Sequence, residues 1–144
     1  MSIFTFGREH EKKCEARYVR DKTQIPLLLS VVDSVHDLIE GHGTEAALAD
    51  VIRIAFIEGG AGVWGNADKW LRKCSPDYPA LQKLWLEFAV HPKAEVRFRV
   101  ACLLNSVPAS IFDALAHNLA ADKSKKVSTM AAARIEEVTM QSAT

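Results

Sequence analysis

The chain has 144 residues, 18 of them basic and 18 acidic, so its formal net charge is zero. A chain of this length suits one domain and buries roughly two-thirds of its unfolded surface without a disulfide or a metal. Zero net charge excludes a general electrostatic attraction to nucleic acid or to an anionic membrane. We therefore expect a single domain over residues 1–144.

The cysteines and the N-terminus indicate which metal sites, disulfides and targeting segments to expect. Cys14, Cys74 and Cys102 are far apart and form no CxxC pair, so we predict no zinc site, disulfide or cofactor. Residues 1–8 carry no basic segment followed by an apolar run, which a signal peptide would have. Apolar stretches are far shorter than the roughly 20 residues that span a bilayer. We predict a cytoplasmic protein.

Four helices are predicted in the first half of the chain. The first covers residues 8–21, because four side chains recur every four residues and form one stripe: Phe6, His10, Cys14 and Tyr18. The second begins at Thr23 and ends before Gly41. The third covers residues 44–58 and the fourth residues 66–73.

Four more helices are predicted in the second half, over residues 79–90, 94–104, 109–121 and 124–139, with a loose tail at 140–144. The sequence shows no segment in which apolar and polar residues alternate as they do in a β-strand. About eight helices joined by short polar turns predict an all-α fold.

Two segments of the second half repeat with a shift of 31 residues and no gap. Large apolar residues coincide under this shift: Leu81 with Phe112, Leu84 with Leu115, Phe88 with Leu119, Val96 with Val127, and Leu104 with Ile135. Ala101 coincides with Ala132, where we expect helices to approach closely. One helix pair cannot bury its own apolar seam, so repeated pairs are expected to stack.

The two units resemble HEAT repeats. Each has a polar turn followed by an inner helix, in residues 91–104 and 122–135, and Asp122 and the pair Val96-Arg97 match the family pattern. His91 and Ser128 depart from it. The resemblance covers residues 79–135 and implies a short right-handed stack of helix pairs, an α–α superhelix. It also implies an interaction scaffold more often than an enzyme.

The middle of the chain is acidic. Between residues 33 and 68, seven carboxylates stand against one arginine. A glycine-rich loop at residues 59–65 holds a tryptophan, and either a contact loop or a linker explains it. The candidate partner-binding residues are Asp33, Asp37, Glu40, Glu45 and Trp64.

The C-terminal part is basic, with seven cationic side chains against three carboxylates between residues 93 and 134. Four lysines occupy equivalent turns of the two repeats: Lys93, Lys123, Lys125 and Lys126. Stacking would place these turns on one edge, where a DNA backbone could lie. Interleaved aromatic residues are missing, so base stacking is not indicated.

Three functional hypotheses follow. The first is a non-enzymatic protein-binding module, in one version a bacterial immunity protein that blocks a basic toxin through the acidic middle segment. The second is binding of the DNA backbone by the basic turns. The third is an enzyme or metal site on the helix face shared by Asp33, His36, Asp37 and Glu40, for which a solvated polar face is the alternative. Other catalytic motifs are missing, so we do not predict an enzyme.

Overall fold

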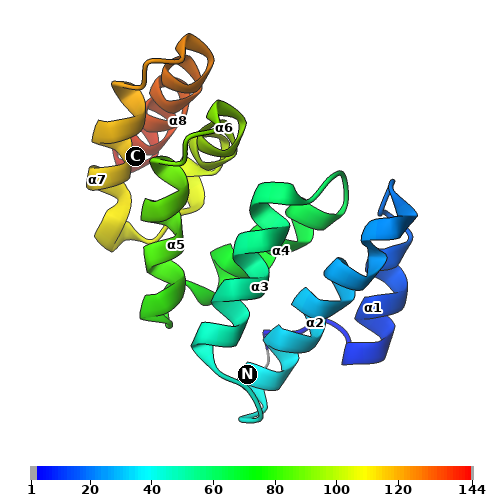
Figure 1. Cartoon of the computed structure of the whole chain (residues 1–144). Helices are drawn as coiled ribbons and strands as arrows, with labels where there is room; N and C mark the ends of the chain where they lie inside the picture. The colour runs from blue at the N-terminus through cyan, green and yellow to red at the C-terminus, as the bar shows by residue number, and fades with distance from the viewer. Residues whose placement is uncertain (1–2, 144) are drawn as a thin grey trace. The chain divides into compact units, whose positions relative to one another are not determined.

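The computed structural model describes residues 3–143 and divides the chain into two compact units, Met1–Leu81 and Gln82–Thr144. Over the described residues the chain forms eight α-helices and two short 3-10 turns, with no strand (Figure 1). The predicted all-α class is thus confirmed. Met1, Ser2 and Thr144, which belong to the expected single domain and to the expected loose tail, lie outside the described residues.

The first unit contains α1 (Arg8–Ala16), α2 (Ile25–Ile39), α3 (Glu45–Glu58) and α4 (Val63–Cys74), with a 3-10 turn at Lys22–Gln24. In this unit α1 packs against α2, α2 against α3 and α3 against α4, and α2 also contacts α4. The core is made of apolar side chains from α2, α3 and α4: Leu28, Val32, Val35, Leu48, Ile52, Phe56 and Leu71.

Local signals explain where these helices begin and end. Pro26 lies in the first turn of α2, where its missing N–H has no intrahelical partner. Gly41, with φ of +84°, turns the chain out of that helix. The hydroxyl of Thr44 accepts the N–H of Ala47 at 3.1 Å and caps α3.

The second unit contains most of α5 (Pro79–Ala89), together with α6 (Ala94–Cys102), α7 (Ala109–Ala120) and α8 (Lys125–Ala143). A 3-10 turn at Leu104–Ser106 follows α6. In this unit α8 packs against both α6 and α7. Thus α8 continues as a helix to Ala143, where the sequence predicted a loose tail.

Burial follows the 31-residue shift in part: Phe112 and Ile135, the counterparts of the buried Leu81 and Leu104, are only half-buried. Four coincident pairs are buried on both sides: Leu84 and Leu115, Phe88 and Leu119, Val96 and Val127, and Val100 and Ala131. Ala101 is fully buried, whereas Ala132 is exposed. The expectation of a close helix approach at Ala132 is therefore wrong, because no described helix covers that side of α8.

The first helix differs most from its prediction. It ends at Ala16, and the four-residue stripe that predicted it does not face the core. Phe6 is 51% exposed and Tyr18 is 74% exposed. The buried residue of α1 is a carboxylate, Glu11. The apolar spacing predicted the wrong buried face of this helix. The face that packs on α2 is the one that carries Arg8, Glu11 and Lys12, and these side chains make polar contacts there.

Candidate functional site

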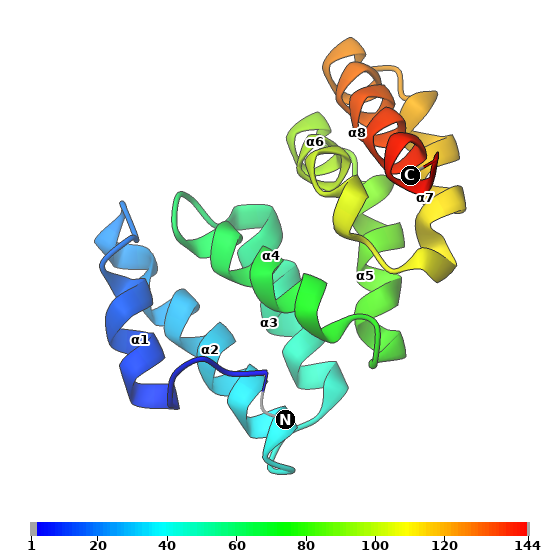
Figure 2. The ribbon, with the colours of Figure 1, turned by 180° about the vertical axis from the view of Figure 1, so that it is seen from behind.

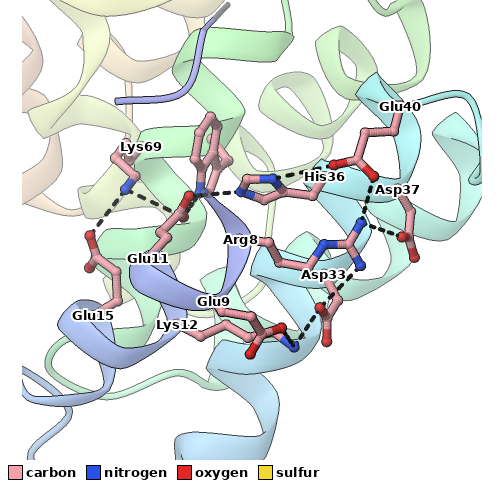
Figure 3. Close-up of polar contacts among 11 residues, drawn as sticks. Arg8, Glu9, Glu11, Lys12, Glu15, Asp33, His36, Asp37, Glu40 and Lys69 are labelled. Carbon is pink, nitrogen blue, oxygen red and sulfur yellow. Dashed lines mark hydrogen bonds and ion pairs between the residues drawn. The ribbon is translucent and has the colours of Figure 1, made fainter. Parts of the chain in front are cut away.

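Polar side chains of α1 meet those of α2 and α4 in one interface of the first unit (Figure 3). The helix sequence REHEKKCEA is almost entirely charged, and its charged side chains alternate in sign along one side. Ion pairs therefore hold α1 in place where an ordinary amphipathic helix would use an apolar stripe.

The guanidinium of Arg8 donates to three carboxylates, two of α2 and that of Glu40 directly after α2. The guanidinium lies 2.7 Å from Asp37, 3.1 Å from Glu40 and 3.4 Å from Asp33. Asp33, Asp37 and Glu40 are spaced by four and three residues, so they share one face of α2. We call these three carboxylates the acidic row.

Lys12, one turn after Arg8 on α1, extends the same contact. Its ammonium lies 2.7 Å from Asp33 and 3.6 Å from Glu9. The hydrogen bond to Asp37 raises the pKa of Arg8, and the hydrogen bond to Asp33 raises the pKa of Lys12, in each case against the opposing effect of burial. Both cations therefore stay charged as long as they remain docked on the row.

Behind the acidic row lies a buried polar cluster. Glu11 is 5% exposed and His36 is 2% exposed. The Nε2 atom of His36 lies 3.0 Å from one oxygen of Glu11, and the indole N–H of Trp70 donates to the other at 3.0 Å. Both oxygens of the buried carboxylate are thus engaged, as a stable interior requires.

Two further contacts close this cluster. The ammonium of Lys69 lies 3.7 Å from Glu11 and 3.1 Å from Glu15, and so ties α4 to α1. The ring of Phe4 stacks on His36 with 3.7 Å between centroids and meets Trp70 edge-on. The segment before α1 accordingly runs over α2 (Figure 2).

His36 contacts both the buried cluster and the acidic row. Its Nε2 atom lies 3.0 Å from Glu11 and its Nδ1 atom lies 3.9 Å from Glu40, while the row also pairs with Arg8 and Lys12 (Figure 3). In the described part of the chain, no group of three or more His, Cys, Asp or Glu side chains is arranged to hold a metal ion. The side chains of Asp33, His36, Asp37 and Glu40 are instead engaged in polar contacts with Arg8, Glu11 and Lys12 of α1.

The other two predicted partner residues have contacts of their own. The carboxylate of Glu45 accepts the backbone N–H of Ala80 at 3.1 Å, at the start of α5. Trp64 is half-buried within α4 and meets Phe56 edge-on, with 6.2 Å between ring centroids. The contacts therefore gather three of the five predicted residues into one surface.

The glycine-rich segment is shorter than predicted, because α4 already begins at Val63. Gly60 donates its N–H to the side chain of Gln24 at 2.8 Å. Gly62 has φ of +88°, and a Cβ there would overlap the carbonyl oxygen of Tyr18. Glycine is required here because the chain passes close to the backbone after α1. The segment is thus a packed connection.

In the second unit, one arginine joins the two lysine-bearing turns. Arg97 forms a bidentate pair with Asp122 at 2.8 and 3.3 Å, and it also donates to the carbonyl oxygens of His91 and Pro92. The turns at residues 91–93 and 121–124 therefore lie side by side.

The four predicted lysines are all exposed, but only Lys93 and Lys123 lie in these turns, since Lys125 and Lys126 form the start of α8. Among the described residues, none of them forms an ion pair within 4.0 Å. The ammonium of Lys126 lies over the ring of Phe98, 4.2 Å from its centroid. This edge of the second unit is therefore cationic.

Sequence reasoning missed Arg8, Lys12, Glu11 and Trp70 as site residues. A signal was present in the alternating charges of α1 at three- and four-residue spacing, which match the carboxylates of α2. That pattern shows that a helix face is charged, but not which helix it meets.

The fold and the site define an all-α protein with a charged helix–helix interface in its first unit. Within the described residues, no helix combines the length and the hydrophobicity needed to cross a lipid bilayer. The chain matches no protein-family model, no curated protein and no solved structure.

Proposed function

We propose that this chain is a non-enzymatic protein-binding module whose acidic row receives a basic protein. The single observation behind this proposal is how three carboxylates, those of Asp33 and Asp37 in α2 and of Glu40 directly after it, surround the guanidinium of Arg8. An arginine of a partner would find the same geometry of acceptors. Charge-assisted hydrogen bonds of this kind are among the stronger polar contacts available at an interface.

The row keeps negative charge after its internal pairing. Its three carboxylates stand against two cations, Arg8 and Lys12, which leaves one negative charge, and Glu9 beside Lys12 adds a second. The carboxylate side chains of the row remain 37%, 42% and 48% exposed. Exposed charge of one sign steers an oppositely charged partner and raises its association rate.

A basic partner meets this surface in one of two ways. It can add to the exposed oxygens beside Arg8, or it can displace Arg8 and Lys12 and take their places. A toxin blocked by an immunity protein is one concrete version, in which the basic surface of a nuclease is covered by this acidic one. The cytoplasm is the compartment in which we place this activity.

HEAT-like stacking is part of the same proposal. The four buried pairs related by the 31-residue shift support it, and so does the ion pair from Arg97 of one repeat to Asp122 of the next repeat, both in the second unit. A right-handed superhelix of helix pairs is the arrangement we infer. Such stacks present extended binding surfaces and need no catalytic residues.

The test is to tag the protein, capture partners from native cells at low salt, and compare two charge-matched variants. The first carries Asp33→Asn, Asp37→Asn and Glu40→Gln. The control carries Asp77→Asn, Asp113→Asn and Glu136→Gln, three carboxylates of exposed residues elsewhere. We expect a basic partner that survives nuclease treatment to be lost from the first variant and kept by the control. Equal capture of the partner by both variants would refute the proposal that the acidic row binds it.

A second candidate function is binding of a DNA backbone. It is supported by the cationic edge of the second unit, where Arg97 holds the two turns together and four lysines are exposed: Lys93, Lys123, Lys125 and Lys126. Phosphate binding by lysines weakens steeply with salt because counterions are released. Affinity for duplex DNA should then fall sharply from about 50 mM to about 200 mM salt. Undetectable binding at the lower concentration would remove this candidate.

A further inference from the structure

The second unit carries an apolar groove that lies beside the cationic edge. It has a volume of about 510 Å³ and runs between α6 and α8. Phe98 of α6 lines it from one side. Thr129, Met130 and Ala133 of α8 line it from the other, together with Lys125 and Lys126. In volume it falls within the range of ordinary ligand sites, about 300–1,000 Å³.

The walls of this groove suit an apolar occupant. Thr129 and Ala133 are exposed and small, so a second helix can approach α8 closely there. Met130 and Phe98 are half-buried and supply flexible and aromatic surface. Apolar surface left in contact with water is a favourable place for apolar side chains of a partner.

The charged residues that line the groove are both cationic. Lys125 and Lys126 are the only charged residues that line it, and their stems form part of its wall. Lys123 lies two residues earlier, before the N-terminus of α8, where the helix dipole also favours negative charge. Nearby carboxylates are engaged: Glu95 pairs with Arg99, and Asp122 pairs with Arg97.

We propose that this groove binds an acidic amphipathic helix of a partner protein. Its apolar side chains, spaced by three and four residues, would fill the space between Phe98 and Ala133. Its carboxylates would meet Lys125 and Lys126. Helix-in-groove recognition of this type combines apolar burial with a charged rim. The surface is distinct from the acidic row and of opposite charge, so the inference goes beyond the proposed function.

Nucleic acid fits the groove less well than a helix does. Phe98 is the one aromatic residue of the lining, and Lys126 already lies over its ring. A base would have to displace that ammonium in order to stack. Thr129, Met130 and Ala133 offer methyl and thioether surface, which a phosphate backbone does not use.

The test uses a fluorescent peptide of about 18 residues, or roughly five helical turns, with Leu on one face and Glu on the other. Binding to the full chain is followed by fluorescence anisotropy. A second peptide with Lys in place of Glu reports the role of charge. We expect saturable binding of the acidic peptide alone, weakened by salt.

Two matched pairs of variants locate the site. Ala133→Glu places a charge in the groove, and Ala132→Glu places the same charge on the next exposed residue of α8, outside the lining. Lys125→Glu with Lys126→Glu reverses the rim, and Lys83→Glu changes an exposed lysine elsewhere in the unit. We expect the groove and rim variants to lose at least about tenfold in affinity, and both controls to bind like the natural chain.

Three results would overturn the proposal. The first is no saturable binding of the acidic peptide, and the second is equal binding by the Ala133→Glu and natural chains. The third is that a short DNA duplex binds to the natural chain and to the Ala133→Glu variant, but not to the variant with Lys125→Glu and Lys126→Glu. That result would mean that the lysines bind phosphate and that the groove takes no part. Circular dichroism on each variant checks that the helices remain folded.

Discussion

At the scale of single residues, the chain depends on a few buried charges that are each fully paired. Glu11 lies inside the first unit with His36 and Trp70 on its two oxygens. Arg97 lies inside the second unit, with its side chain 7% exposed, against Asp122. Removing one partner of a buried pair leaves the other without compensation, and this costs more than the pair itself contributes.

Glu11→Ala should therefore destabilise the first unit. The indole N–H of Trp70 would lose its acceptor, and a buried donor without a partner costs about 1–3 kcal/mol. Urea unfolding followed by tryptophan fluorescence measures the change. Glu15→Ala, which removes only a half-buried contact to Lys69, is the control and should cost less. Equal costs would mean that the buried cluster is not the stabilising part of the interface.

Arg97→Ala should cost about 1–3 kcal/mol, because the carboxylate of Asp122 loses its ionic partner and keeps only the hydrogen bond from the N–H of Ser124. Urea denaturation measures this, with Arg99→Ala as the control, since Arg99 pairs with the exposed side chain of Glu95. A cost below that of the control would argue against Arg97 as the link between the two turns.

The same pair predicts how stability depends on acid. Burial opposes ionisation of Asp122, but the hydrogen bonds from Arg97 and from the N–H of Ser124 outweigh it, so its pKa lies below the ordinary 3.8. The contribution is thus present above pH 3.8 and is lost as pH falls through the lowered value. In denaturation at decreasing pH, Asp122→Asn should show a smaller loss of stability in this range than the natural chain.

At the scale of elements, α1 is the helix whose attachment depends most on ion pairs. Arg8, Lys12 and Glu15 each bind across to another helix, at side chains that are 21–28% exposed. Pairs with this exposure are individually weak and are screened by salt. The helix is held by their sum and by the buried contacts of Glu11.

We expect α1 to open more readily at high salt. Amide hydrogen exchange over residues 8–16 should accelerate between low salt and about 1 M salt, where the screening length is about 3 Å. Exchange in α3, which is held by Leu48, Ile52 and Phe56, provides the comparison and should change less. Salt-independent exchange in α1 would show that Glu11 and Phe4 alone keep it docked.

At the scale of the whole molecule, opposite charge divides along the chain. The first unit has twelve carboxylates and ten cationic side chains, while the second has six and eight. Zero net charge is therefore the sum of a slightly acidic and a slightly basic unit. Each unit carries one surface whose charge has the same sign as the net charge of that unit. These surfaces are the acidic row in the first unit and the lysine-rimmed groove in the second.

The three thiols report on the folding of the whole chain. Burial raises the pKa of Cys74 to about 11 and also raises that of Cys102. Since the thiolate is the reactive form, both should alkylate slowly in the native state at neutral pH. Mass spectrometry after a brief iodoacetamide treatment should find Cys14 modified first, and Cys74 only when the protein is unfolded in urea. Early modification of Cys74 would show that its unit opens readily.

The sequence by itself determined the helices, because helix starts, stops and apolar spacing are local properties. Pro26, Gly41 and Thr44 mark ends that the structure keeps, and the 31-residue shift relates four pairs of buried side chains in the second unit. These features depend on neighbours within a few residues or on an internal comparison of the chain with itself.

Only the tertiary structure decided which charges meet. Periodicity put Phe6 and Tyr18 inside, whereas the interface buries Glu11, because its partners His36 and Trp70 come from other helices 25 and 59 residues away. The acidic row was predicted from α2, but its partners Arg8 and Lys12 were not. An ion pair between distant residues has no period and no fixed spacing, so its partner is determined by how the helices pack.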